Sequence, residues 1–276
     1  MKIKPNSKNI FDEYAEYYDI VYQDKNYVSE ASFISGLIRN YCNRKGLIRV
    51  LDLACGTGLH AIELAKMGHK VDASDISAKM IKAARENARL KNLKITFHQE
   101  SFQTADRINK KFDVVISMFS AINYLTSCKD MLRSLENIHG LLESGGIFIF
   151  DFWNGNAVID DFAPVRVKRM NKGTKSVLRY SENAIDRLTQ IVNVKFNFML
   201  FNKDKIVGEF SENHICRYFF IREMEDLLEM SGFKVISRCP FMSPGKEISC
   251  NDWNVTYVVR KYTGDRATIH KNRFIC

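Results

Sequence analysis

The sequence lacks several features that would place it in common classes of protein. Its seven cysteines form no paired CxxC spacing and no cluster with histidine, which argues against a bound metal. No signal-peptide stretch follows the first methionine, and no apolar run approaches the roughly 18 residues that a membrane-spanning helix needs. These absences predict a protein with no metal and no membrane partner, located in the reduced cytoplasm.

The net charge of +9 could suggest a nucleic-acid partner, but the excess is concentrated in two segments. Residues 165–180 carry six basic and no acidic side chains, and residues 260–276 carry five basic side chains and one acidic. Subtracting these from 41 basic and 32 acidic residues leaves 30 against 31 elsewhere. A broad surface for a phosphate backbone is therefore not indicated, and a small-molecule substrate is favoured.

Short apolar runs alternate with longer amphipathic segments from residue 47 to residue 152. Strands are expected at 48–53, 70–73, 94–98, 112–118 and 147–152, with helices at 58–67, 77–91 and 129–142 between them. Because several of these strands are apolar on both faces, they belong in a parallel sheet. The last elements of this sheet are expected as a helix at 221–231 and strands at 233–237 and 254–260.

The segment 165–217 has a different character, with Val, Phe and Tyr alternating with polar residues and turn signals at 171–173 and 202–205. It predicts three or four antiparallel strands. The fold is therefore expected to be α/β and Rossmann-like, with a central, mostly parallel sheet and an antiparallel β insertion. The expected divisions are an N-terminal helical lid (1–44), a core (45–160), the insertion (161–217), the rest of the core sheet (218–261) and a basic tail (262–276).

A turn at residues 52–58 closes the first strand and opens a helix. The small residues Ala54, Gly56 and Gly58 allow the backbone to approach a ligand at the helix N-terminus. Residues 56–61 also satisfy the G-x-G-x-x-[GA] dinucleotide pattern, so the glycines alone leave NAD binding open. A tight turn without any ligand is a further alternative.

Two acidic residues favour S-adenosyl-L-methionine (SAM) over a dinucleotide. Asp52 lies inside the turn, where its carboxylate can meet the amino-acid end of SAM and would repel a pyrophosphate. Asp75 ends the second strand, where it can bind both ribose hydroxyls. Its alternative role is to cap the helix that follows.

In this order, the motifs resemble those of class I SAM-dependent methyltransferases, which also have a glycine turn like residues 142–146 before the fifth strand. This family has a central seven-stranded sheet. More narrowly, the sequence is similar to sugar N,N-dimethyltransferases that act on nucleotide-linked amino-deoxyhexoses. That similarity rests on residues 18–22, 25–27, 30–31, 54–60, 118–125, 152–153 and 210–214.

The resemblance implies a lid over SAM, with Tyr22 near the transferred methyl and Tyr27 near the carboxylate end; the alternative is that both residues pack a capping helix. Where the family has an acidic residue for the adenine amino group, this sequence offers Glu100, shifted by one, or Ser101. Ile76, Phe102 and Met118 are candidates for the apolar adenine slot, and each could equally be core. The complete predicted cofactor set is Tyr22, Lys25, Tyr27, Asp52, Ala54, Gly56, Gly58, Asp75, Ile76, Met80, Glu100, Ser101, Phe102 and Met118.

The methyl of SAM sits on a sulfonium, so the enzyme mainly has to align a nucleophile behind it. An amine must be neutral to attack, and Tyr22, Tyr124 and His214 are the candidate catalytic residues that could take its proton. Tyr124 follows the fourth strand, at the edge of the sheet where ligands collect. His214 could instead be an ordinary strand residue bonded to backbone.

The expected reaction is methyl transfer to an amine of a small molecule, with a nucleotide-linked amino sugar as the narrower form. The basic run 166–179 could hold a diphosphate, although such a run is more often a solvated strand face. A small-molecule O-methyltransferase or a glycine-type N-methyltransferase would share the donor site. A non-catalytic SAM-binding module that contacts RNA or protein, and an NAD-dependent oxidoreductase, are alternatives from other classes.

The loop at 119–124 lacks the Asn/Asp-Pro-Pro-Tyr/Phe signature of DNA amino-methyltransferases, which further argues against a nucleic-acid substrate. The β insertion should expose edge strands, which readily pair across a two-fold axis. A homodimer is the expected assembly.

Overall fold

The computed structural model describes residues 20–21 and 25–262. The chain forms two compact units. The described part of the first comprises residues 20, 21, 25, 26 and 161–216, and that of the second comprises 27–160 and 217–262. The first residues of the predicted lid, Tyr22 and nearly all of the basic tail lie outside the described residues.

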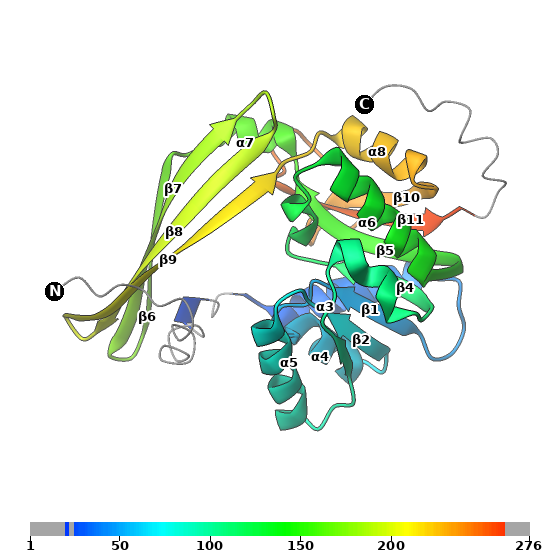
Figure 1. The fold of residues 1–276 in the computed structure, drawn as a ribbon, viewed down its shortest axis with the longest axis horizontal. Coiled ribbons are helices and arrows are strands. Elements are labelled where there is room, and N and C mark those ends of the chain that lie inside the picture. Colours follow the sequence, from blue (N-terminus) through cyan, green and yellow to red (C-terminus); the bar gives the residue numbers. More distant parts are fainter. Residues whose placement is uncertain (1–19, 22–24, 263–276) are drawn as a thin grey trace. The chain divides into compact units, whose positions relative to one another are not determined.

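The second unit is built on a seven-stranded sheet with the order β10-β11-β5-β4-β1-β2-β3 (Figure 1). Strands β1 to β5 are mutually parallel where they pair, whereas β11 is antiparallel to both β5 and β10. The predicted Rossmann-like, mostly parallel sheet is therefore confirmed. Its strands are β1 (Arg49–Leu53), β2 (Lys70–Ser74), β3 (Thr96–His98), β4 (Phe112–Ser117), β5 (Leu142–Trp153), β10 (Phe233–Pro240) and β11 (Asn254–Lys261).

Helices cover both faces of this sheet because its strands are apolar on both sides. Val114 and Ile116 of β4 pack with α3 (Tyr27–Tyr41), α4 (Leu59–Lys66) and α5 (Ala78–Leu90). Val115, which points to the other face, packs in the cluster that contains α6 (Cys128–Leu141) and α8 (Ile221–Met230). The shorter helices are η1 (Phe102–Ile108), η2 (Ala121–Tyr124) and α7 (Gly155–Asp160).

Strand β5 is longer than the sequence predicts. It was expected over residues 147–152, after a glycine turn, but it already begins at Leu142. Leu142 pairs with Phe112 and Ile147 pairs with Val114, so five residues of β5 span the distance that two residues cover on β4. The glycine segment is thus an irregular part of the strand, made possible by Gly145 at φ +72°.

The first unit contains a four-stranded sheet in the order β6-β7-β8-β9, as the alternating pattern of 165–217 predicts (Figure 1). Its strands are β6 (Val165–Lys172), β7 (Lys175–Asp186), β8 (Ile191–Asn202) and β9 (Lys205–Arg217), and the pairs β6–β7 and β7–β8 are antiparallel. Both predicted turns are present, with Gly173 at φ +62° and Lys203 at φ +55°. One face buries Val177, Phe198 and Leu200.

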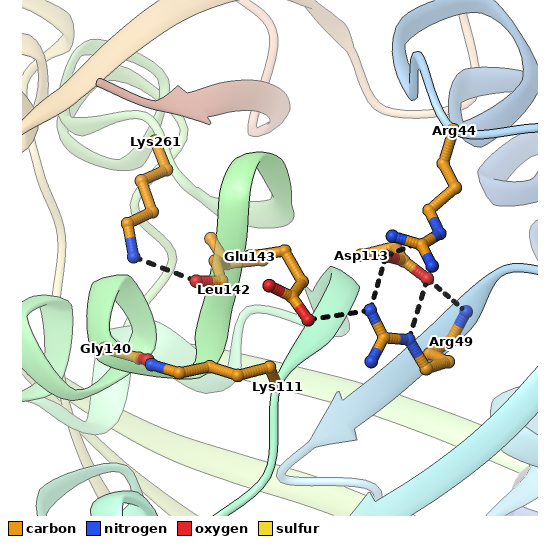
Figure 2. A network of polar contacts seen from close by, with 8 residues as sticks. All are labelled: Arg44, Arg49, Lys111, Asp113, Gly140, Leu142, Glu143 and Lys261. Carbon is orange, nitrogen blue, oxygen red and sulfur yellow. Dashed lines mark hydrogen bonds and ion pairs between the residues drawn. The ribbon is translucent and has the colours of Figure 1, made fainter. Parts of the chain in front are cut away.

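The amino ends of the central strands are joined by a polar network around Asp113 (Figure 2). The buried Asp113 carboxylate accepts hydrogen bonds from the Arg49 backbone amide (2.9 Å) and from Arg49 Nε and Nη2 (3.1 and 2.9 Å). Arg44 Nε lies 3.3 Å from the same carboxylate, and Arg49 Nη2 also donates to Glu143 at 2.9 Å. The network thereby connects β1, β4 and β5.

The pKa of Asp113 shows which effect prevails in this network. Burial would raise that pKa, but the hydrogen bonds from Arg49 and the nearby charges of Arg49 and Arg44 lower it below its ordinary value. The pKa of Arg49 is raised by its hydrogen bonds to Asp113 and Glu143. Folding therefore favours the ionised pair.

We predict that Asp113→Ala lowers the free energy of unfolding at pH 7 by about 2 to 3 kcal/mol, because a buried carboxylate that accepts three hydrogen bonds is lost. Glu143→Gln is the matched control. Glu143 is a partly exposed partner of the same guanidinium, so its loss should cost about 1 kcal/mol or less. Urea titrations followed by circular dichroism measure both values.

The lowered pKa of Asp113 also fixes the pH dependence. The contribution of the pair is complete above the unfolded-state pKa of about 3.9 and is lost as the pH falls through the lower, folded-state value. The stability gap between wild type and Asp113→Ala should therefore be constant above about pH 5 and shrink below about pH 4. A gap that widens on acidification would contradict this account.

Candidate functional site

The turn between β1 and α4 has the conformation that a ligand-binding loop requires. Ala54, Gly56 and Gly58 all have positive φ angles, of 66°, 55° and 78°. Among the described residues, no heavy atom lies within 4 Å of the position that a Cβ would take on Gly56. A Cβ on Gly58 would instead lie 3.0 Å from the Ala84 side chain. Gly56 therefore leaves room for a ligand, whereas Gly58 allows α4 to pack against α5.

Asp75 connects this turn to the end of β2. Its Oδ2 accepts the backbone N–H of Gly56 at 2.9 Å, and its Oδ1 accepts the N–H of Ser77 at 2.8 Å. Each ionised oxygen has a second lone pair, so the carboxylate can accept two further hydroxyl groups. Ser77, not Asp75, is the N-cap of α5, since its side chain accepts from Met80 N. The capping role that the sequence left open for Asp75 thus belongs to Ser77.

Asp52 and Cys55 define the electrostatics of the turn. Asp52 is buried in β1, between Ala73 of β2 and Ile116 of β4. Burial raises the pKa of the Cys55 thiol, and the negative charges of Asp52 and Asp75 raise it further. The thiol therefore stays protonated and is not a nucleophile.

The residues proposed for adenine differ in exposure. Ile76 is 72% exposed directly beside Asp75, and Met80 is half-buried one turn into α5. Phe102 and Met118 are buried, Phe102 in the cluster around α6 and Met118 in the cluster around α3 to α5. Of the four, Ile76 has the most side-chain surface available to a ligand.

Glu100 and Ser101 follow β3, at the same edge of the sheet. Ser101 begins η1 in a reciprocal capping arrangement with Thr104, in which Ser101 N donates to Thr104 Oγ1 at 3.0 Å. Glu100 is half-buried, its backbone carbonyl accepts from Ser74 Oγ at 2.7 Å, and its carboxylate lies 3.9 Å from Arg107. The Ser101 hydroxyl is thus engaged in the cap, which leaves the Glu100 carboxylate as the better candidate for an amino group.

Two of the three predicted lid residues are described. Lys25 and Tyr27 are both half-buried, and Tyr27 is the first residue of α3. The Tyr27 ring lies edge-on to the His60 ring, with 5.1 Å between the centroids. Tyr22 lies outside the described residues.

The loop after β4 is held in an unusual conformation by buried polar groups. Phe119 and Ser120 both have positive φ angles, of 65° and 54°, which non-glycine residues rarely adopt. The fully buried Asp151 carboxylate accepts both Ser120 N and Ser120 Oγ at 2.9 Å. Two large aromatic side chains of this loop stay exposed, Phe119 at 62% and Tyr124 at 52%.

A second buried group, Asn123, holds the other end of this loop. Its Nδ2 donates to the Arg217 carbonyl at 2.7 Å, and its Oδ1 accepts Trp153 N at 3.4 Å. The loop is therefore fixed to the end of β5 and to the segment entering α8. Tyr124 accordingly stands at the carboxyl edge of the parallel strands, as predicted from its position after β4.

His214 belongs to the other unit, on β9. Its ring lies 5.4 Å from that of Phe196, and its Nε2 is 3.4 Å from the Glu212 carboxylate. The two described candidates for a base, His214 and Tyr124, therefore belong to different units.

Sequence reasoning missed four residues near the site: Asp151, Asn123, Glu30 and His60. Asp151 had a visible signal, because it interrupts an otherwise apolar strand at 147–152. Glu30 and His60 lie 30 positions apart, and no local pattern pairs them. Asn123 could not be separated from an ordinary loop amide.

Residues 50–146 match the methyltransferase domain family. Over 81% of its length the chain is 28% identical to an N,N-dimethyltransferase of dTDP-3-amino-3,4,6-trideoxy-alpha-D-glucopyranose from Streptomyces venezuelae, 91% of which is covered. It is 33% identical to a glycine/sarcosine N-methyltransferase from Aphanothece halophytica, over 48% of this chain and 49% of that relative.

The fold is also found among solved structures. A SAM-dependent methyltransferase from Clostridium acetobutylicum superposes with a TM-score of 0.78 at 23% identity, covering 92% of this chain and all of that one. The coverage includes regions outside residues 50–146, so the likeness of fold extends well beyond the matched domain.

We predict that Asp75→Ala weakens SAM binding at least about 100-fold. The two hydrogen bonds that we expect from the ribose hydroxyls to this carboxylate are lost, and the Gly56 amide loses its acceptor. Gly56→Val should abolish measurable binding by filling the open space in the turn. Isothermal titration with SAM and S-adenosylhomocysteine measures both effects.

Ser77→Ala is the control for Asp75→Ala. It removes the cap of α5 and costs about 1 kcal/mol of stability, but it keeps the backbone amide that Asp75 accepts. SAM affinity should therefore stay close to that of the wild type. Unchanged affinity in Asp75→Ala would remove the ribose assignment.

Proposed function

Because this chain is a class I SAM-dependent methyltransferase, we propose that it transfers a methyl group to an amine of a small molecule, and specifically to a nucleotide-linked amino sugar. SAM supplies the methyl on a sulfonium when it is bound. The chain contributes the donor site around Gly56 and Asp75 and a surface that aligns the acceptor amine behind the methyl.

The observation that carries this proposal is the extent of similarity to each group of relatives. The glycine/sarcosine relative matches over 134 residues, close to half of this chain, and the amino-sugar relative matches over 226 residues. The longer match exceeds the 97 residues from 50 to 146 that form the matched methyltransferase domain. Similarity beyond the donor-binding part supports a shared class of acceptor.

The loop after β4 supports an acceptor with a ring. Asp151 and Asn123 stabilise a strained loop backbone. In this conformation the side chains of Phe119 and Tyr124 are exposed. Strained, over-determined loops with exposed aromatic side chains are typical of ligand-binding sites. The faces of these rings suit the C–H surface of a deoxysugar, and the Tyr124 hydroxyl suits its polar groups.

The four-stranded sheet supports an acidic group on the acceptor. Lys168 of β6 lies directly opposite Arg179 of β7, so two positive charges share one face. Ammonium and guanidinium groups both donate hydrogen bonds to phosphate oxygens, so the pair suits a diphosphate. The Arg179 guanidinium also lies 5.1 Å from the centre of the Phe196 ring, which restricts its orientation.

Attack by the amine releases a proton after the methyl has transferred. Tyr124 and His214 are the described side chains that we propose for taking it or passing it to water, and Tyr22 is the third candidate. Because the sulfonium is already activated, alignment contributes more to the rate than this proton transfer does.

An acceptor screen tests the proposal. With methyl-labelled SAM, dTDP-linked 3-amino-deoxyhexoses should become mono- and dimethylated, whereas glycine, sarcosine and hydroxyl acceptors should not react. Mass spectrometry of the product identifies the methylated atom. Turnover of glycine would favour the glycine-type alternative, and SAM binding without turnover of any acceptor would favour a non-catalytic module.

For the basic pair, we predict that Lys168→Gln or Arg179→Gln raises the KM for a dTDP-linked acceptor about tenfold and leaves SAM affinity unchanged, because one charged contact to phosphate is lost. Arg169→Gln is the matched control. Arg169 lies opposite Leu178 and points to the other face of the same strand, so its loss should not change KM. Equal effects of all three variants would contradict a specific diphosphate site.

A further inference from the structure

We propose that Glu30 and His60 form a buried latch that positions Tyr27 over the amino-acid end of SAM. Both are positioning residues: they act on SAM through Tyr27 and the backbone of the two helices. The inference rests on the cofactor and does not depend on which acceptor is methylated.

The pair is short and buried. His60 Nε2 lies 2.6 Å from Glu30 Oε2, and both side chains are at least 90% buried. A hydrogen bond of this length has a narrow range of orientations. It joins the first turns of α3 and α4, since Glu30 is the fourth residue of α3 and His60 the second residue of α4.

The same histidine contacts Tyr27. Tyr27 and Glu30 are three residues apart on α3, so they lie on one side of the helix. The imidazole thus contacts the Tyr27 ring edge-on, with 5.1 Å between centroids, while it is bonded to Glu30. Rotation of the imidazole would break one contact or the other, so Glu30 fixes the ring against which Tyr27 rests.

The location of the latch connects it to the donor site. His60 follows Gly58 by two residues, and the turn from Asp52 to Gly58 contains the open position at Gly56. If the ribose of SAM binds Asp75 and its amino-acid tail follows this turn, the tail lies beside the first turn of α4. Tyr27, resting on His60, is therefore beside the amino-acid end and not beside the adenine.

Adhesion between the helices does not explain why this pair is polar. Helices α3 and α4 already belong to one apolar cluster, through Ile34, Leu37, Ala61 and Leu64 among others. Burying two polar side chains costs desolvation, and apolar residues of similar volume usually stabilise packing as well or better. What the polar pair adds is a fixed orientation for the side chains around it.

The protein contains an internal control for this idea. Ser35 Oγ and His69 Nε2 lie 3.1 Å apart and join the middle of α3 to the segment that follows α4. Ser35→Ala and His69→Ala remove a polar contact from the same region of packing. A purely structural role for the latch predicts the same consequences for both pairs.

The experiment compares two ligands in each variant. Isothermal titration is carried out with S-adenosylhomocysteine and with 5′-methylthioadenosine, which lacks the amino-acid end, on full-length protein. His60→Ala and Glu30→Ala should weaken S-adenosylhomocysteine binding about tenfold and leave 5′-methylthioadenosine binding within about twofold. Ser35→Ala and His69→Ala should change neither affinity, and His60→Gln, which keeps a donor for Glu30, should recover part of the loss.

The ratio of the two affinities within one variant keeps the test valid if a substitution lowers stability, because the unfolded fraction affects both ligands equally. If His60→Ala does not fold, Glu30→Ala supplies the same ratio. Equal losses for both ligands, or an equal loss in the Ser35 and His69 variants, would overturn the proposal. A failure to methylate amino sugars would leave this result unchanged, so the two hypotheses fail separately.

Discussion

The geometry of the site depends on the register between β1 and β4, and the bond between Arg49 and Asp113 is the interaction that fixes it. Arg49 donates to one carboxylate through its backbone amide and through two guanidinium nitrogens, so the pair specifies both position and orientation. A slip of one residue would turn every apolar side chain of a strand to the wrong face. It would also shift Asp52 relative to the loop after β4, and with it the proposed donor site relative to the proposed acceptor site. A structural pair at the amino ends of the strands therefore fixes the relative positions of residues at their carboxyl ends.

Carboxylates recur in this apolar sheet, and their partners distinguish their roles. Asp113 is surrounded by arginine and stabilises the ionised, folded state. Asp151 accepts the backbone amide and the hydroxyl of Ser120, which makes it suited to holding a strained loop. Asp75 accepts two backbone amides and is half-buried, so it combines fixed geometry with access for a ligand. The role of a buried carboxylate is thus indicated by its hydrogen-bond partners, and burial alone does not identify a binding residue.

The sequence predicts the strands and helices to within a few residues because each side of the parallel sheet is covered, which leaves continuous apolar runs between helical segments. It fails at β5, where the glycine segment lies inside the strand, since the pairing of Leu142 with Phe112 depends on β4 and has no local signal. The glycine turn and Asp75 were identified because their residue types are required locally. Side chains such as Phe102 could not be assigned, since an apolar residue beside a ligand and one in the core look alike in sequence.

Donor and acceptor recognition are encoded differently in this chain. The donor site that we propose uses residues of consecutive elements, from β1 to α5, together with α3, where Glu30 meets His60. One relative that resembles about half of this chain is a glycine/sarcosine N-methyltransferase, so the acceptor differs among the relatives. For the acceptor, the recognition element that we propose in the second unit is the loop around Ser120. That division explains why motifs identify the cofactor readily, whereas the acceptor has to be inferred from how far the similarity extends.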